Sequence, residues 1–430
     1  MTGTAAQPYS KWYLRYALGL LVVVYAFNFI DRQILVIIQE SIKKDLGLSD
    51  AQLGLLSGFT FAIFYVSVGI PIARLADRGV RRNVIAWSVG VWSVMTAICG
   101  MAGSYVQLLA ARIGVGVGEA GGSPPAHAII SDYFPPATRT RALSIYSAGI
   151  YLGILSANVV GGWLNQHIGW RMTFVAVGLP GLIIALLVRF TIREPRRGQA
   201  DPVPVELPPA PGLREAFRTV WGIPSFRLMA LAAGFNAFVN YGAGNFGISF
   251  FARSHHLTPA QIGATYGAAY GIAGMAGTLL GGIIATKVGR NDLRRYALVP
   301  AVALVVGLVL RLIAYNAVGS TRAMFFLIPA ECLSAFFLGP CIAIGHALVP
   351  PGLRAFASSI LFFVLNLIGL GGGPLFTGLV SDYLGSRFGT ESLRWALMVT
   401  SMGWIPAVAL FLLAYRILGR DLARATPTRA

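Results

Sequence analysis

The sequence predicts an all-α integral membrane protein in which twelve transmembrane helices form two six-helix bundles related as parallel repeats. Three observations predict this fold. Hydrophobic residues make up 56% of the 430 positions and charged residues 12%, roughly half the charged fraction of a soluble domain. Apolar runs of membrane-spanning length recur along the chain, and two motifs return one half-chain later. One soluble core cannot bury so much apolar surface, so lipid must surround the helices.

The apolar runs are long enough to cross a bilayer, which takes about 20 residues of helix. The first run is too long for a signal peptide, and no small-residue cleavage site follows it. An even number of spans places both termini on one side of the membrane. We expect the spans at residues 14–40, 51–76, 84–104, 106–131, 140–165, 170–190, 226–252, 260–286, 296–315, 322–349, 355–381 and 392–417.

The distribution of lysine and arginine predicts which side holds the termini. With cytoplasmic termini, 24 of the 34 basic residues lie inside, 7 lie outside, and Arg32, Arg112 and Arg311 lie within spans. Cytoplasmic loops normally carry such an excess. The net charge of +18 therefore reflects topology, and because the basic residues form no domain of their own we expect no nucleic-acid partner.

A proline-rich segment divides the spans six and six. We expect an N-terminal six-helix bundle at 1–192, a cytoplasmic linker at 193–225 and a C-terminal six-helix bundle at 226–430. The linker carries charges of both signs and closely spaced prolines, which are typical of an exposed connection. Residues 213–218 resemble a short helix that lies along the membrane surface.

Two motifs repeat at equivalent places in the halves. The sequence "FPPATRTRALSI" (134–145) returns as "VPPGLRAFASSI" (349–360), and "ARLADRGVRR" (73–82) returns more weakly as "GGIIATKVGR" (281–290). A displacement by six spans preserves orientation, so the halves are parallel repeats. This arrangement favours a central site and alternating access.

The span number, the central linker and "LADRGVRR" (75–82) resemble the major facilitator superfamily. Ala73 and Val80 depart from that family's loop signature, which has glycine at both places. "NFIDRQIL" (28–35) and "RIGVGVGEAGGSPPAHAIISDYFPP" (112–136) resemble its spinster branch more narrowly. The resemblance covers essentially the whole chain and implies the major facilitator fold in a bacterial inner membrane.

The spinster resemblance implies a secondary active transporter for an amphipathic lysolipid of the sphingosine-1-phosphate or lysophospholipid type, with coupling to protons. A carrier of drugs or small organic anions on the same fold is one alternative. An uncoupled, scramblase-like lipid path and a non-transporting receptor are others. We expect one or more arginines to hold the headgroup and apolar walls to hold the tail.

Four ionisable residues fall deep within spans 1 and 4. At about 1.5 Å per residue, Asp31 and Arg32 lie roughly 14 Å below the outer end of their span, between Arg112 at about 9 Å and Glu119 at about 20 Å. Charges at such depth are costly, so they need partners or a polar cavity. We expect Asp31 and Glu119 to exchange protons while Arg32 exchanges between them; a static salt-bridge cluster is the alternative.

Further polar residues in the second half are candidates for substrate binding. Asn236, Asn240 and Tyr241 lie beside glycines in span 7, which predicts a hinged, cavity-lining helix or hydrogen bonds that join helices. Glu331 in span 10 either lines the cavity or makes a structural hydrogen bond. With Arg32 and Arg112, these residues form the predicted substrate-binding set. Arg311 is expected to snorkel toward the interface and is assigned no role.

The inner end of span 2 is the candidate gate, with Asp77, Arg78, Arg81 and Arg82. An acid at the C-terminal end of a helix is unfavourable unless it is paired, so we expect Asp77 to bond arginines or a neighbouring helix end. The family resemblance makes this loop an inner latch that stabilises the outward-open state. Plain anchoring by positive charge is the alternative for the arginines.

Enzyme chemistry is not expected. The sequence has no nucleotide loop, metal-ligand spacing or nucleophile–base set, and its three cysteines lie inside apolar runs. We therefore predict no cofactor and no metal. The expected partners are a lipid-like small molecule, protons and the bilayer, and we expect the transporter to be a monomer.

Overall fold

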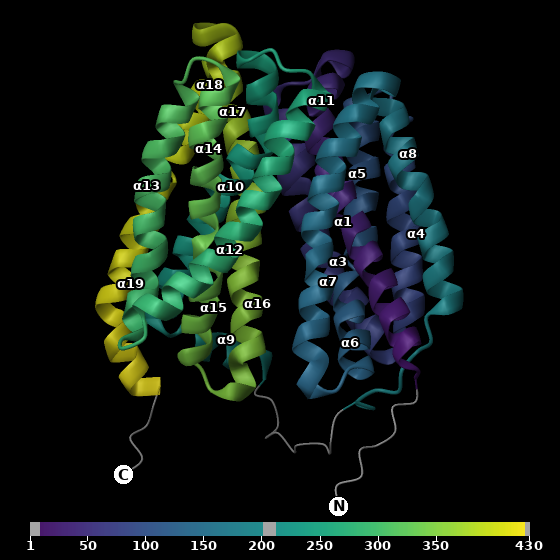
Figure 1. Ribbon diagram of the computed structural model, residues 1–430, viewed down its shortest axis with the longest axis vertical. Coiled ribbons are helices and arrows are strands. Elements are labelled where there is room, and N and C mark those ends of the chain that lie inside the picture. Colours follow the sequence, from purple (N-terminus) through teal and green to yellow (C-terminus); the bar gives the residue numbers. More distant parts are fainter. Residues whose placement is uncertain (1–8, 201–211, 426–430) are drawn as a thin grey trace, which may run out of the picture. The chain divides into compact units, whose positions relative to one another are not determined.

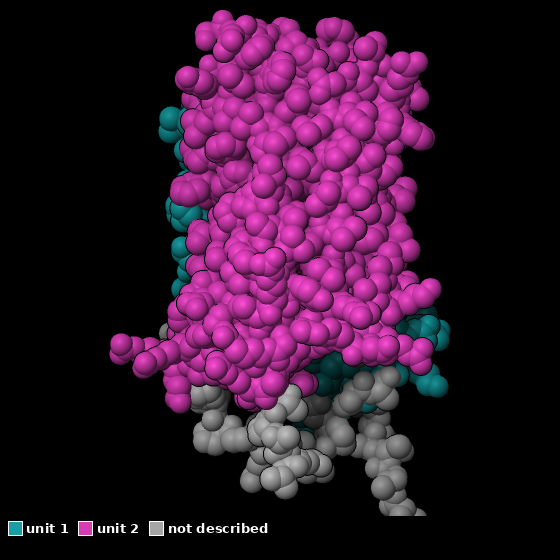
Figure 2. All heavy atoms as spheres, turned by 90° about the vertical axis from the view of Figure 1, so that its left-hand side faces the viewer, with its two compact units in different colours: residues 1–46, 63–206 teal, residues 47–62, 207–430 magenta. Residues whose placement is uncertain are grey.

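The computed structural model describes residues 9–200 and 212–425, apart from a few side chains within helices. Every regular element in these ranges is a helix. Contacts between residues divide the chain into two units: unit 1 holds residues 1–46 and 63–206, and unit 2 holds residues 47–62 and 207–430. Figure 2 colours them separately. The division after residue 206 falls within the expected linker, whereas the assignment of 47–62 to unit 2 was not anticipated.

Unit 1 is a bundle of long helices that run side by side (Figure 1). Its elements are α1 (Lys11–Leu46), α3 (Thr60–Arg78, from residue 63), α4 (Arg81–Cys99), α5 (Tyr105–Glu119), α6 (Ser123–Tyr133), α7 (Pro136–Ser156), the π-helix η2 (Ala157–Gly161) and α8 (Gly162–Thr191). Within α8 the chain turns at Gly169, whose φ of +76° favours glycine. This turn separates the fifth expected span from the sixth.

Unit 2 contains a short preceding helix and the second set of spans. Its elements are α2 (Asp50–Gly54), η1 (Leu55–Phe59), α9 (Leu213–Trp221), α10 (Pro224–Ser254), α11 (Pro259–Ile262), η3 (Gly263–Gly267), α12 (Ala268–Val288), η4 (Leu293–Ala297), α13 (Leu298–Tyr315), α14 (Ser320–Ser334), η5 (Ala335–Phe337), α15 (Leu338–Ala347), η6 (Pro351–Leu353), α16 (Arg354–Leu365), η7 (Asn366–Gly372), α17 (Gly373–Phe388), η8 (Gly389–Glu391), α18 (Ser392–Ser401) and α19 (Trp404–Ala425). The amphipathic α9 buries Ala216 and Val220 and bends by 86° from α10.

The helices match the expected spans. By length and apolar composition alone, six continuous helical segments of the described chain can cross a membrane, or seven if the bent pair α9–α10 counts as one span. Two of these segments, Arg141–Thr191 and Phe356–Arg424, contain 51 and 69 residues. At about 1.5 Å per residue each is more than twice as long as one crossing needs, so each holds more than one span.

The repeat is visible in the backbone as well as in the sequence. The interruption of span 4 at 120–122 has its counterpart 215 residues later in η5, which interrupts span 10 at 335–337. The π-helix η1 in span 2 likewise returns 208 residues later as η3 in span 8. These displacements equal those of the two sequence motifs. The helices and the repeat together give the all-helical, twelve-span fold of two parallel repeats that the sequence predicts.

Candidate functional site

Unit 1 brings together the four ionisable residues from spans 1 and 4. Arg32 on α1 donates from Nε to Oε2 of Glu119 on α5 over 2.5 Å. Arg112 on α5 donates from Nη1 to the backbone oxygen of Asp31 over 3.1 Å. The exposed fractions of Asp31, Arg112 and Glu119 are 1%, 2% and 0%, whereas the Arg32 side chain is 26% exposed. The protein thus encloses Asp31, Arg112 and Glu119, whereas the Arg32 side chain is partly accessible.

Local structure explains why Glu119 needs a cation. Glu119 is the last residue of α5, where the helix dipole disfavours a negative charge. The positive charge of Arg32 offsets both the unfavourable helix dipole and the hydration that the Glu119 carboxylate loses on burial. The guanidinium of Arg32 also lies 5.1 Å from the ring centroid of Phe29, one turn earlier on α1. Gly118 lets α5 approach α4 closely, because a Cβ atom there would lie 2.7 Å from the backbone nitrogen of Trp92.

Several buried polar atoms of this cluster lack hydrogen-bond partners within the described chain. They are Oδ1 of Asp31, Oε1 of Glu119, Nε of Arg112 and both polar side-chain atoms of Asn28. Each unsatisfied buried group costs about 1–3 kcal/mol. A cluster that is incompletely bonded has acceptors ready for a proton and donors ready for another anion.

Unit 2 holds a second buried ion pair, which corrects the expectation for Arg311. Arg311 is 0% exposed and does not snorkel: its Nη2 donates to Oε1 of Glu331 over 2.5 Å and to Oδ1 of Asn240 over 3.4 Å. Its guanidinium carbon lies 4.3 Å from the Trp404 ring centroid. Snorkelling requires a free path to the interface, and packing against α14 and α19 removes that path. Glu331, with 3% exposure, therefore has a cationic partner that we had not assigned.

The other predicted substrate-binding residues of unit 2 lie on α10 beside this pair. Asn236 is fully buried and donates to the backbone oxygen of Ser334, while Asn240 donates to Oδ1 of Asn236 over 3.4 Å. Asn240 and Tyr241 are half-buried. Asn236 thus joins helices, whereas Asn240, which bonds Asn236 and Arg311, and Tyr241 are less deeply buried.

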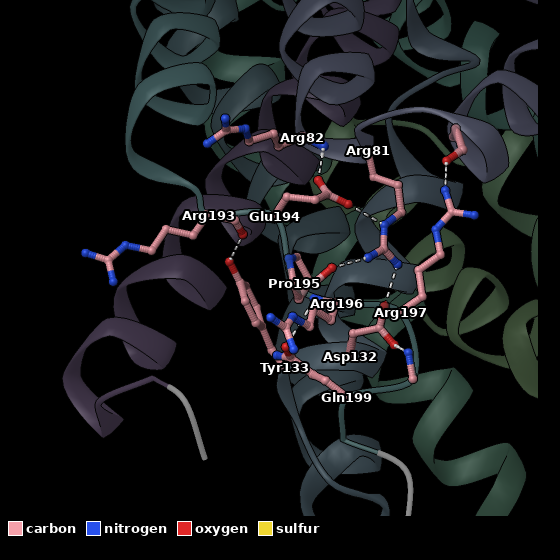
Figure 3. Close-up of polar contacts among 12 residues, drawn as sticks. Arg81, Arg82, Asp132, Tyr133, Arg193, Glu194, Pro195, Arg196, Arg197 and Gln199 are labelled. Atoms are coloured by element: carbon pink, nitrogen blue, oxygen red, sulfur yellow. Dashed lines mark hydrogen bonds and ion pairs between the residues drawn. The ribbon is translucent and has the colours of Figure 1, made fainter. Parts of the chain in front are cut away.

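Two arginines of the candidate gate in unit 1 bind acidic side chains and backbone oxygens. Arg81 donates from Nη1 to Asp132 over 2.5 Å, from Nε to Glu194 over 2.7 Å and from Nη2 to the backbone oxygen of Pro195 (Figure 3). The backbone N–H of Arg82 donates to Glu194, and its side chain donates to the backbone oxygen of Ile192. This cluster fixes the segment that follows α8 to the start of α4 and the end of α6.

The remaining gate residues are Asp77 and Arg78. Arg78 is exposed, and the side chain of Asp77 lies outside the described part of the structure. Sequence reasoning missed Asp132 and Glu194, although a signal was present: they are the sole acidic residues between Glu119 and Asp201. Opposite charges attract, so an isolated acid near several arginines has several possible cationic partners.

Comparison with known proteins is consistent with these features. Residues 21–374 match the family model "Major Facilitator Superfamily". An MFS-type efflux pump of Mycolicibacterium smegmatis is 31% identical, with 93% of this chain and 92% of the relative covered. The sphingosine-1-phosphate transporter SPNS2 of Danio rerio is 27% identical, with 89% and 80% covered.

Solved structures narrow the assignment. A bacterial homologue of the human lysosomal transporter Spinster, in an inward-facing and unoccupied conformation, is 34% identical with a TM-score of 0.90. The comparison covers 96% of this chain and 99% of that one. An occupied, inward-facing form gives a TM-score of 0.85 at 33% identity. The chain therefore belongs to the Major Facilitator Superfamily and is a multi-pass membrane transporter of the spinster-like branch.

Proposed function

We propose that this transporter moves an amphipathic lysolipid of the sphingosine-1-phosphate or lysophospholipid type by alternating access, and that protons exchanged at Asp31 and Glu119 drive it. The Arg32–Glu119 pair beside the buried Asp31 is the observation that carries the proposal. Ionisable groups within membrane spans are expensive, and they usually mark ion or substrate paths. The similarity to SPNS2, which is named a sphingosine-1-phosphate transporter, supports the lysolipid class.

The proton step begins at the free oxygen of Glu119. A proton that binds Oε1 neutralises the carboxylate and removes the Coulombic part of its attraction for Arg32. Arg32 then needs another anion, and its partly exposed side chain is able to move toward Asp31 or toward the headgroup of an anionic lysolipid. Loss of the proton restores the Arg32–Glu119 pair. The differential affinity of Arg32 for these anions is what would bias the transporter between its two conformations.

We propose that the residues that bind substrate include Arg32 and Arg112 of unit 1 and Asn236, Asn240, Tyr241 and Glu331 of unit 2. Arg32 supplies the mobile cation and Arg112 a second cation that becomes available once Asp31 rearranges. In unit 2, Asn240 and Tyr241 are half-buried, whereas Asn236 and Glu331 are buried and bonded to neighbouring groups.

We further propose that Asp77, Arg78, Arg81 and Arg82 act as an inner gate. The distribution of basic residues supports a bacterial inner membrane with cytoplasmic termini, and we propose a monomer.

The test is transport in proteoliposomes with an imposed pH gradient. Sphingosine-1-phosphate and a panel of lysophospholipids should accumulate only when the gradient is present, and Glu119→Gln and Asp31→Asn should each abolish this accumulation. Asp45→Asn is a matched control, because Asp45 forms an exposed ion pair with Arg171 in the same unit. Full gradient-driven accumulation by both amide variants would overturn the proton mechanism. Equilibration of lipid regardless of pH would identify a scramblase-like path.

A drug or small organic anion carrier is the second candidate, and the similarity to the Mycolicibacterium smegmatis efflux pump favours it. Both candidates share the fold and the ionic cluster, so they differ in the ligand alone. Gradient-driven transport of a cationic dye, with no response to lysolipids in the same vesicles, would select this alternative.

A further inference from the structure

The second span is divided between the two units. Residues 47–62 group with unit 2, whereas the rest of α3 groups with unit 1 (Figure 2). The first turns of this span therefore belong by sequence to the first half of the chain and by packing to the second half. Any displacement of one unit relative to the other must bend this span near residue 62 or release its first turns from unit 2.

An ion pair holds the first turn of this span. Asp50, at 2% exposure, accepts two hydrogen bonds from Arg253 at the end of α10, each of 2.7 Å, and one of 2.6 Å from the hydroxyl of Ser381 on α17. Such bidentate arginine–carboxylate bonds are the strong, directional kind. Arg253 is itself largely buried, with 16% of its side chain exposed, so solvent screens the pair little.

A second carboxylate, on α17, binds the same turn. Asp382 accepts hydrogen bonds from the backbone N–H groups of Asp50 and Ala51, over 2.9 and 2.8 Å. The first N–H groups of a helix have no partners inside the helix, and its N-terminal end attracts negative charge. α17 thus satisfies the start of this span as a capping side chain would, but from about 330 residues away in sequence.

Next to the ion pair, the first turns of the second span and the segment η7–α17 run antiparallel, with their backbones in close contact. We call this contact the seam. A Cβ atom on Gly54 would lie 2.3 Å from the oxygen of Pro374, and one on Gly58 would lie 2.4 Å from the oxygen of Leu370. On the facing helix, a Cβ atom on Gly378 would lie 2.2 Å from the oxygen of Asp50. The two glycines of the second span are four residues apart, the spacing that lets membrane helices pack most closely.

The seam ends at a π-helical turn. η1 covers Leu55–Phe59, and the division between the units follows three residues later. π-helical turns interrupt the regular hydrogen bonds of an α-helix and often occur at functional sites. The span thus has a firmly held start and an irregular turn immediately before the residues that belong to the other unit.

We propose that Asp50, Arg253 and Asp382 form a latch that fastens the start of the second span to unit 2, and that the latch opens once in each transport cycle. With cytoplasmic termini, this latch lies at the outer ends of the spans, where its release opens the outer side. The cycle rests on the proposed alternating access, but the latch itself is testable without substrate.

The experiment measures how often the latched turn separates from unit 2. Leu53, on α2, is 1% exposed, so a cysteine in its place should react slowly with a membrane-impermeant maleimide. The three native cysteines are replaced by serine in this background. Asp50→Asn and Arg253→Gln should each raise the labelling rate about tenfold, because each removes charge-assisted hydrogen bonds. Arg171→Gln, which breaks the exposed pair with Asp45, is the control and should leave the rate unchanged.

The double variant Asp50→Arg with Arg253→Asp distinguishes a latch from general damage to the fold. It reverses the pair, so it should return the labelling rate toward that of the unaltered protein. Slow labelling in both single variants would overturn the proposal, as would rapid labelling in all variants including the reversed pair. Neither outcome depends on lysolipid or proton transport, so failure of the latch and failure of the proposed function are separable.

Discussion

Replacing Arg32 by methionine should lower the free energy of unfolding by about 3–5 kcal/mol at neutral pH, the range measured when one partner of a buried ion pair is removed. The structure explains the loss, and the 26% exposure of the Arg32 side chain places it in the lower part of that range. Glu119 is 0% exposed, lies at the C-terminal end of α5 and takes its charge-assisted bond of 2.5 Å from Arg32. Its other oxygen has no partner within the described chain. Without the arginine, the buried carboxylate must either stay charged without a partner or take up a proton, and both states are less stable than the ion pair.

A double variant tests whether the unpaired charge of Glu119 causes this loss of stability. Arg32→Met combined with Glu119→Gln removes both charges and should recover most of the loss, leaving about 1 kcal/mol for the side-chain hydrogen bond. Unfolding of the purified protein in detergent, followed by the tryptophan fluorescence of both variants at pH 7 and pH 5, measures the effect. Acid should narrow the gap for the single variant, since a proton on Glu119 removes the uncompensated charge. A single variant as stable as the parent, or a double variant no better than the single, would refute the reasoning.

Two further predictions concern unit 2. Arg311→Met should destabilise the protein by about 3–5 kcal/mol, and Glu331→Gln by less, because Trp404 and Asn240 still hold the arginine in Glu331→Gln. Thermal unfolding of the two variants measures which is less stable. A lower melting temperature for Glu331→Gln than for Arg311→Met would contradict this prediction. Gly54→Leu should cost about 1–3 kcal/mol through the clash with Pro374, as overpacking does. Gly69→Leu in the same span meets nothing within 4 Å, and its melting temperature should match that of the parent.

The spans could be predicted from the sequence because lipid restricts the structures that can cross a membrane. A helix that crosses a bilayer must satisfy its own backbone and present apolar side chains over its whole length. The runs at 14–40 and 226–252 therefore coincide with α1 and α10. The repeat was detectable for a similar reason, since Pro-Pro and arginine at 135–139 and 350–354 mark equivalent loops in both halves.

The ionic cluster of unit 1 was predictable in part. Depth alone indicated that Asp31 and Arg32 lie between Arg112 and Glu119, but it did not indicate which atoms bond. The bond from Arg112 goes to the backbone oxygen of Asp31 rather than to its carboxylate. Such choices depend on the relative rotation of α1 and α5, which the spacing of residues does not specify.

Contacts between distant segments could not be predicted. Arg311 lies near a span end, so its sequence position suited snorkelling; its partner Glu331 comes from the next span, and Trp404 from the last. Asp50 and Arg253 are separated by about 200 residues, and each alone resembles an ordinary charge at a membrane surface. Pairing of this kind follows from tertiary packing.

Infrared difference spectroscopy of the purified protein tests the central claim most directly, because the carbonyl stretch of a protonated carboxylic acid is distinct from that of a carboxylate. Acidification of the reconstituted protein should produce a protonated-carboxyl band that is reduced in Glu119→Gln and in Asp31→Asn and retained in Asp45→Asn. Retention of the complete band in both Glu119→Gln and Asp31→Asn would contradict the account, since the proton would then bind elsewhere.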